Sequence, residues 1–471
     1  MKQHRLLSAA IACAVCIGAQ AQIMTLKECL ETGISESYQI MLVSISQEKA
    51  GYNDSWLYAG GAPTVSATGS YSGSLSSNDA TLATDGSSVS NRNVLDHTLS
   101  AQIRADWTVF DGFSIQATRS RLEELHKQGA IQTRITIEDY IASLTTEYYN
   151  LVKQTIHLKN LEYAASLSKE RLRISSERYD MGGNSRLEMQ QAQVYFNSDS
   201  AKSLKQHESV ASANIRINRL MSNQDLRSVH VAADTAINLL SGLDYESLYE
   251  DMMKTNSSLL RAESNRTLAQ LDRRTVQARN YPYLKVNASY GLSHNIYGNS
   301  TYTERTNWGP SFGATMGINL VTGKQRVQER NARLDELAAD ITVEQLELQL
   351  RANLDDFWQA YQNNLMLLEL QEQNLKTAQE TMDIAQERYL LGNLSGIEMR
   401  EAQKSLLDAE ESLLQVQYDT KVCEISLLQI SGRIMQYLEE RYFTDFGVVL
   451  DLKKAFFGIQ KRLLGLTHLN T

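Results

Sequence analysis

Hydrophobic and polar residues alternate in four segments of this chain, each about ten residues long. In the first segment, apolar or small residues occupy every second position from Val65 to Leu75, and serine or threonine fills the positions between them. A period of two places each set on one face of a β-strand. The alternation predicts strands at 64–75, 98–110, 283–293 and 311–320, with Pro310 just before the fourth.

These predicted strands have the length of strands that cross a lipid bilayer. A tilted strand needs about 9–11 residues to do so, and outward apolar residues alternating with inward polar ones are typical of outer-membrane barrels. An amphipathic sheet covering a soluble core is the alternative interpretation. The uniform serine, threonine and asparagine of the polar face favour the barrel.

Four strands are too few to form a closed barrel. A sheet edge that faces lipid leaves backbone N–H and C=O groups without partners. The chain is therefore expected to supply a share of a barrel formed by several copies. Three copies give twelve strands, an even number within the known range. The links at 76–97 and 295–308 are polar and predict loops.

Long helical segments follow each predicted strand pair. Apolar residues recur at helical spacing, and no proline interrupts 113–222 or 325–437. Periodic runs much longer than about 25 residues indicate coiled-coil packing. Each segment is predicted to be a helical hairpin, whose returning helix is expected at 187–221 or 397–437. A soluble coiled-coil rod is the alternative, but such a rod does not account for the four predicted strands.

A seventeen-residue phrase occurs twice, once near the middle of each helical segment. Residues 177–193 and 387–403 are identical at nine positions. We interpret the chain as an internal duplication, with a first repeat at 22–235 and a second at 236–441. Each copy of the phrase is then the turn of one hairpin.

The phrase has the composition of a helix end followed by a helix start. Gly182 and Gly392 suit the left-handed conformation that ends many helices. Ser185 and Ser395 suit the N-cap of the returning helix, and an acidic residue three positions later completes a capping box. This local role explains the phrase without any function.

The remaining composition restricts the class of protein. Lys2, Arg5, an apolar run and Ala19-Gln20-Ala21 predict a signal peptide at 1–21. The chain has 46 Lys and Arg against 55 Asp and Glu, which argues against a nucleic-acid partner. We find no catalytic constellation, cofactor motif or metal-ligand spacing, so the chain is not expected to be an enzyme. Cys29 and Cys423 are expected to be free thiols, although pairing stays open, and 442–471 is a tail without an assigned role.

The doubled order of elements and the repeated phrase resemble the TolC-type outer-membrane efflux family. The shared motif consists of Arg, an aromatic residue, Gly, Ser, an acid and Ala: Arg178, Tyr179, Gly182, Ser185, Glu188 and Ala192 in the first repeat, and Arg388, Tyr389, Gly392, Ser395, Glu398 and Ala402 in the second. The resemblance implies a homotrimer with a twelve-stranded barrel in outer-membrane lipid, continued by a long α-helical barrel in the periplasm. It also implies a periplasmic adaptor and an inner-membrane transporter as partners, and a passive export duct as the function.

The resemblance further implies roles for residues of the two turns. Glu398 and Glu401 match a lumen-facing carboxylate ring at the periplasmic aperture, while Glu188 and Tyr389 match residues that hold the aperture shut. Leu394 departs from the basic residue of the family's best-described gate, and Arg186 or Arg400 is the candidate substitute. The residues expected to contact the adaptor, unless they merely form the turns, are Gly182, Gly183, Asn184, Ser185, Gly392, Asn393, Leu394 and Ser395.

A periplasmic coiled-coil adaptor or scaffold is the competing hypothesis for function. The strands distinguish the two, because an adaptor would lack four alternating segments of bilayer-crossing length. The sequence does not indicate the cargo, the particular pump or the resting state of the aperture.

Overall fold

The computed structural model describes residues 22–81, 86–183, 185–240, 242–300, 302–320 and 323–442. The predicted signal peptide, Asn184 and the tail after Tyr442 lie outside the described residues. The chain forms two compact units, and each takes segments from both sequence repeats. Unit 1 draws its described residues from 1–46, 130–261 and 344–471, and unit 2 from 47–129 and 262–343.

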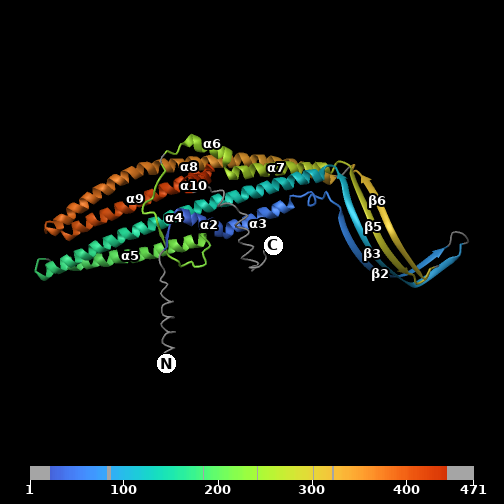
Figure 1. The fold of residues 1–471 in the computed structure, drawn as a ribbon, viewed down its shortest axis with the longest axis horizontal. Coiled ribbons are helices and arrows are strands. Elements are labelled where there is room, and N and C mark those ends of the chain that lie inside the picture. Colours follow the sequence, from blue (N-terminus) through green and yellow to red (C-terminus); the bar gives the residue numbers. More distant parts are fainter. Residues whose placement is uncertain are drawn as a thin grey trace, which may run out of the picture. The chain divides into compact units, whose positions relative to one another are not determined.

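The centre of unit 2 is one antiparallel sheet of four strands. The strands lie side by side in the order β2, β3, β5, β6 (Figure 1). Their bounds are Thr64–Thr81 for β2, Ser88–Asp111 for β3, Tyr283–Ile296 for β5 and Glu304–Gly317 for β6. Within the described residues, β2 and β6 each pair on one side only, so the sheet is open.

The pairing register aligns the apolar positions of all four strands. Val65 pairs with Ala105, Ala105 with Ala288, and Ala288 with Phe312. One position further along, the row is polar: Ser66, Arg104, Ser289 and Ser311. Hydroxyl pairs bridge strands in the polar rows, with Ser70 and Ser100 Oγ 2.7 Å apart and Ser289 and Ser311 Oγ also 2.7 Å apart. The alternation therefore predicted the two faces of the sheet correctly.

The strand ends differ from the sequence prediction. The predicted loop at 76–97 is mostly strand, because β2 continues to Thr81 and β3 begins at Ser88. Backbone pairing sustains this extension without a strict alternation of apolar and polar residues; it passes a bulge between Ser76 and Asn78. The fourth strand was predicted at 311–320 but runs from Glu304 to Gly317, since β5 extends to Ile296 and pairs with Glu304. Pro310 therefore lies inside β6, where a strand at the sheet edge tolerates a missing N–H.

Two long helical hairpins carry the repeated phrase at their turns. Helix α4 (Ser114–Asp180) is followed by α5 (Arg186–Leu220), and α8 (Gly323–Leu390) by α9 (Gly396–Ile430). The predicted returning helix to residue 437 is wrong at its end. Gly432 has φ +72°, so the chain turns after α9 and resumes as α10 (Ile434–Tyr442).

The remaining described elements are shorter helices that precede strands of the sheet, and two three-residue strands. Helices α2 (Leu26–Glu36) and α3 (Tyr38–Asn53) precede β2, and α6 (Tyr245–Thr255) and α7 (Ser257–Ala278) precede β5. Strands β1 (Gln22–Met24) and β4 (His230–Ala232) pair in parallel. Among the described helices, none combines the length and the apolarity needed to cross a membrane.

The main core of unit 1 lies around the middle of α4. Leu144, Tyr148 and Leu151 are fully buried there together with Ile217 of α5 and Leu30 of α2. Cys29 and Cys423 are both free thiols, as expected. Burial raises the pKa of the Cys29 thiol to about 12, which makes this thiol unreactive at neutral pH.

A buried ion pair fixes the segment that joins the two repeats. Lys421 Nζ lies 2.5 Å from Glu424 Oε1 on α9, and both side chains are almost completely buried. Glu424 Oε2 accepts the backbone N–H of Leu240 at 2.9 Å, while the Tyr361 hydroxyl donates to the Leu240 carbonyl at 3.0 Å. The charge of Glu424 is thus balanced by Lys421 and by a backbone donor, as a buried carboxylate requires.

Candidate functional site

The two hairpin turns have the same local structure. Gly182 and Gly392 both have φ +78°. In the first turn, Glu188 N donates to Ser185 Oγ at 3.3 Å and Ser185 N donates to Glu188 Oε2 at 3.3 Å. In the second, the corresponding bonds between Ser395 and Glu398 measure 3.2 and 3.0 Å. Both predicted capping boxes are therefore confirmed.

The surroundings of the two turns differ. Tyr389 before the second turn is 6% exposed, whereas Tyr179 at the matching position is 38% exposed. Tyr389 belongs to an apolar cluster with Met382, Ala385, Met399 and Ala402. Burial also raises the pKa of the Tyr389 hydroxyl. Of the two turns, only the second buries its tyrosine.

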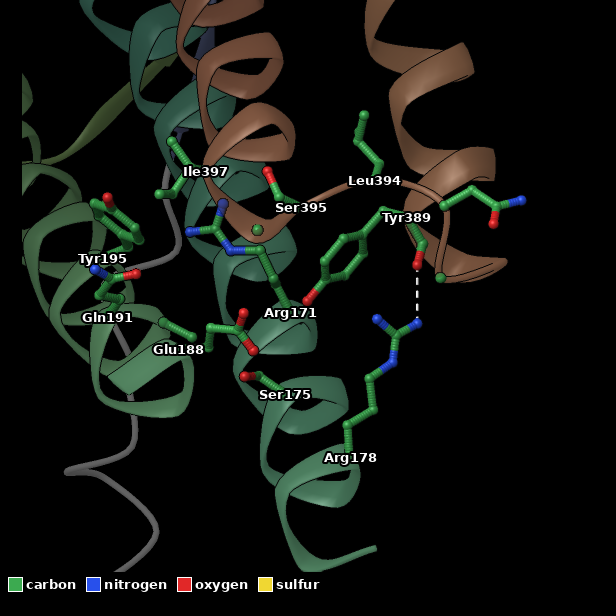
Figure 2. A pocket seen from close by; sticks show the side chains of 14 residues that line it. Arg171, Ser175, Arg178, Glu188, Gln191, Tyr195, Tyr389, Leu394, Ser395 and Ile397 are labelled. Carbon is green, nitrogen blue, oxygen red and sulfur yellow. Dashed lines mark hydrogen bonds between the residues drawn. The ribbon is translucent and has the colours of Figure 1, made fainter. Parts of the chain in front are cut away.

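Arg178 joins the end of the first long helix to the end of the second. Its Nη2 donates to the Tyr389 carbonyl at 2.8 Å and to the Leu390 carbonyl at 3.2 Å. Its guanidinium also lies over the Tyr389 ring, 5.0 Å from the centroid. Figure 2 shows the bond to Tyr389 as a dashed line. The last carbonyls of a helix have no partner within the helix, so an arginine there supplies both hydrogen bonds and a favourable charge.

A buried polar cluster lies on the helices behind the turns. Asp199 of α5 is 1% exposed and receives both guanidinium nitrogens of Arg400 of α9, at 2.5 and 2.8 Å. Ser168 of α4 also donates to this carboxylate. Gln403 Nε2 donates to the Ala164 carbonyl at 2.8 Å, and Arg171 Nη1 donates to Gln403 Oε1 at 3.3 Å. The cluster therefore joins α4, α5 and α9.

Arg400 was one of two candidate substitutes for the basic gate residue of the family. The sequence did not predict that it pairs with Asp199. The sequence pattern did not predict a role for Asp199, Ser168, Arg171 or Gln403. The sequence provided only weak evidence for this cluster. Asp199 lies on the side of α5 that also buries Ala192 and Gln206. A charged residue on a buried helix face requires a partner of opposite charge. The other candidate, Arg186, is exposed at the start of α5.

The predicted acidic residues are exposed in the single chain. Glu398 and Glu401 both lie at the surface near the start of α9. Hydrogen bonds from the Ser395 side chain and backbone lower the pKa of Glu398. Glu188 is exposed and serves its own capping box. The lumen-facing ring requires further copies of the chain, so it remains a prediction.

Most of the predicted adaptor-contact residues lie at the surface of the turns. Gly182, Gly183, Ser185, Gly392, Asn393 and Ser395 are exposed. Leu394 is half-buried and packs against the cluster of Tyr389. Asn184 lies outside the described residues. No group of His, Cys, Asp and Glu suited to a metal ion occurs among the residues that the structure describes.

Comparison with known proteins finds one family model that matches part of the chain, and solved structures of similar fold. The model of the family described as "Outer membrane efflux protein" matches residues 248–433, which include the second turn. A comparison with curated proteins finds no match.

Solved structures with the same fold cover most of the chain. A membrane protein from Pseudomonas aeruginosa has a TM-score of 0.72 at 13% identity, over 86% of this chain and 90% of its own. The outer membrane protein VceC from Vibrio cholerae has a TM-score of 0.70 at 16% identity, over 86% and 96%. The CmeC outer membrane channel of Campylobacter jejuni has a TM-score of 0.70 at 15% identity, over 87% and 86%. These likenesses show that the chain has the fold of outer-membrane channels.

The family match and the fold together agree with the resemblance seen in the sequence. The family and its solved neighbours are channel proteins and not enzymes. Residues 248–433 are thus similar to the outer membrane efflux protein family, and the chain as a whole has the fold of solved outer-membrane channels.

Proposed function

We propose that three copies of this chain form a passive export duct through the outer membrane. The observation that carries the proposal is the open four-stranded sheet with one apolar face. Phe312 is 88% exposed and Trp308 73% exposed on this face. Such side chains in water would expose a large apolar patch, whereas lipid accommodates them.

The open edges of the sheet supply the reason for assembly. Within the described residues, β2 and β6 have unpaired sides, and lipid cannot satisfy the backbone groups that they leave. Pairing β2 of one copy with β6 of the next would close the barrel. Three copies give the twelve strands that the resemblance implies.

The polar face would line the pore. Serine pairs bridge neighbouring strands on this face, and Arg104 forms an ion pair with Asp106 at 2.8 Å. A hydrated lumen solvates such groups without a large cost. In the proposed barrel, the apolar face would therefore contact lipid and the polar face would contact water.

The hairpin turns would form the periplasmic end of the duct. We propose that Glu398 and Glu401 of the three copies encircle the aperture and favour cations, as rings of carboxylates do in cation channels. The exposed residues Gly183, Asn393 and Ser395 would contact the adaptor of a tripartite system. The links of Arg178 and Arg400 would hold the turns of one copy together while the aperture is shut.

Conductance of the purified protein in a planar bilayer tests this function. We expect a stable, cation-selective pore. Glu398→Gln combined with Glu401→Gln should lower the cation-to-anion permeability ratio several-fold, because it removes six carboxylates from the trimer. Glutamine at position 398 retains the capping box. Glu263→Gln changes an exposed carboxylate of α7, which belongs to neither turn, and should leave selectivity unchanged.

Two results would count against parts of the proposal. Protein that folds but never conducts would contradict the duct. A pore whose selectivity is the same with and without the two carboxylates would contradict the acidic ring and leave the duct intact.

A further inference from the structure

Three consecutive large apolar residues form a turn between α3 and β2, the segment that leads into the sheet (Figure 1). The exposed fractions of their side chains are 48% for Trp56, 75% for Leu57 and 64% for Tyr58. A run of exposed apolar residues is unfavourable in water and indicates a contact with something apolar. The four strands of the proposed duct do not include these residues, so the barrel alone does not account for them.

The turn is held in place from one side only. Ala59 is buried in a small cluster with Ile115 and Leu122 of α4. The backbone of the turn closes on itself, because Gly61 N donates to the Trp56 carbonyl at 3.0 Å. Ala59 therefore anchors the turn to α4, while the three larger side chains before it stay at the surface.

The turn lies on the apolar side of the sheet. Trp107 is two positions from Ala105 on β3, so its side chain belongs to the apolar face. Trp107 Nε1 donates to the Gly61 carbonyl at 3.1 Å. The Trp56 indole packs so closely against Gly61 that a Cβ there would clash with it. Trp56 is therefore on the side of the sheet that would face lipid in the proposed barrel.

Other aromatic residues mark this end of the sheet as the level of a membrane boundary. A bulge after Thr108 places Phe110 opposite Leu284 of the apolar face. The ring of Phe110 contacts that of Phe113 with centroids 5.1 Å apart, and Phe113 contacts Tyr281 at 6.3 Å. The side chains of Phe113 and Tyr281 are more than half exposed. Aromatic residues gather where the apolar band of a barrel meets the lipid headgroups.

We propose that the turn of Trp56, Leu57 and Tyr58 is a lipid anchor outside the barrel, seated in the headgroup layer of the leaflet at this end of the sheet. The inference rests on the proposed function, which places the apolar face in lipid. No charged residue occurs between Ser55 and Pro63, and the rings of Trp and Tyr combine an apolar body with one polar group, as this layer favours.

A second copy of the chain is the other conceivable cover for the turn. The next copy would meet the sheet along the free side of β2. The turn, however, is bonded through Gly61 to Trp107 of β3, which is an inner strand. The bond seats the turn on the face of the sheet and not at its free edge, which favours lipid.

Quenching of tryptophan fluorescence by brominated phosphatidylcholine tests the anchor in the full-length protein, reconstituted in vesicles. The chain has four tryptophans, so Trp308→Phe combined with Trp358→Phe leaves Trp56 and Trp107 as emitters. Adding Trp56→Phe leaves Trp107 alone, and the difference is the signal of Trp56. Bromine near the headgroup should quench this signal at least about twofold more than bromine at the ends of the acyl chains.

Variants of the most exposed residue of the turn supply a second measurement. Leu57→Asp places a charge in the anchor and should reduce the quenching of Trp56 by about half or more, because a carboxylate draws the turn toward water. Leu57→Met is the matched control: it retains an apolar side chain and should leave the quenching unchanged. Position 57 is 75% exposed, so the fold should tolerate both changes.

The signal of Trp308 separates the failure of this inference from the failure of the proposed function. Trp308 lies on the apolar face of the sheet, and comparing the unaltered protein with Trp308→Phe isolates its signal. If lipid quenches Trp308 but the headgroup bromine does not preferentially quench Trp56, the anchor is overturned and the duct is intact. An unquenched Trp308 would contradict both. If Trp56 is shielded from lipid and Leu57→Asp dissociates the assembled protein, a second copy covers the turn and the anchor is likewise overturned.

Discussion

The two hairpin turns share a sequence phrase and a backbone conformation but differ in their environment. Gly182 and Gly392 have the same φ, and both turns form a capping box. Yet Tyr179 is partly exposed while Tyr389 is buried beneath Arg178. The local phrase thus determines how the chain turns. The neighbouring helices determine which of the two turns is held in place.

Contacts between the hairpins account for this asymmetry. Arg178 of the first hairpin reaches the carbonyls that end α8, and Arg400 of the second reaches Asp199 of the first. Both links place an arginine from one repeat on a group of the other. Two turns that share a sequence phrase therefore make different contacts, since the first hairpin supplies Arg178 and the second turn supplies the tyrosine that this arginine covers.

The largest effect is expected from Asp199→Ala, which removes the carboxylate shared by the two hairpins. Arg400 would then be a largely buried charge without its partner, at a cost of about 3–5 kcal/mol. Hydrogen exchange of the amides at 395–405 should report this cost as a lower opening free energy. Arg173→Ala breaks exposed ion pairs and should change this opening free energy by less than about 1 kcal/mol. Equal effects of the two variants would show that the buried link does not hold the hairpins.

The tyrosine pair tests the asymmetry itself. Tyr389→Ala empties a buried position and should destabilise its turn by about 3 kcal/mol. Tyr179→Ala affects a partly exposed ring, so about 1 kcal/mol or less is expected. Hydrogen exchange of residues 177–193 and 387–403 measures both turns in one experiment. Similar losses at the two positions would mean that the turns are equivalent in the assembled protein.

A smaller effect is expected from pH at the second turn. Hydrogen bonds from Ser395 lower the pKa of Glu398, so their stabilising contribution is present above the pKa that Glu398 has in the unfolded chain. It is lost as the pH falls through the lower folded value. A smaller protection factor, which is the intrinsic exchange rate divided by the observed rate, is therefore expected at the start of α9 in acid. Ser395→Ala should reduce this pH dependence; if the variant keeps the full dependence, the capping box is not its cause.

The sequence predicted those features that depend on neighbouring residues. Strict alternation located the four strands, and the spacing of Gly392, Ser395 and Glu398 predicted the second turn and its cap. The extension of β2 and β3 was missed because backbone pairing does not require the alternation on which the prediction relied. The end of α9 was missed because one glycine within a helical pattern is a weak signal.

The buried cluster shows why the rest of the site was not predictable. Asp199 and Arg400 are separated by 201 positions, and an acid or a base on a long helix usually faces water. Their pairing follows from how α5 and α9 pack, which the repeat alone does not determine.

The number of chains in the assembled protein tests the central claim most directly. Four strands per chain would close barrels of eight, twelve or sixteen strands from two, three or four copies, all of which are allowed even numbers. Native mass spectrometry of protein extracted from the outer membrane should give three chains of 53.0 kDa, less the mass of the predicted signal peptide. A stable monomer, or an assembly of two or four chains, would contradict the shared twelve-stranded barrel.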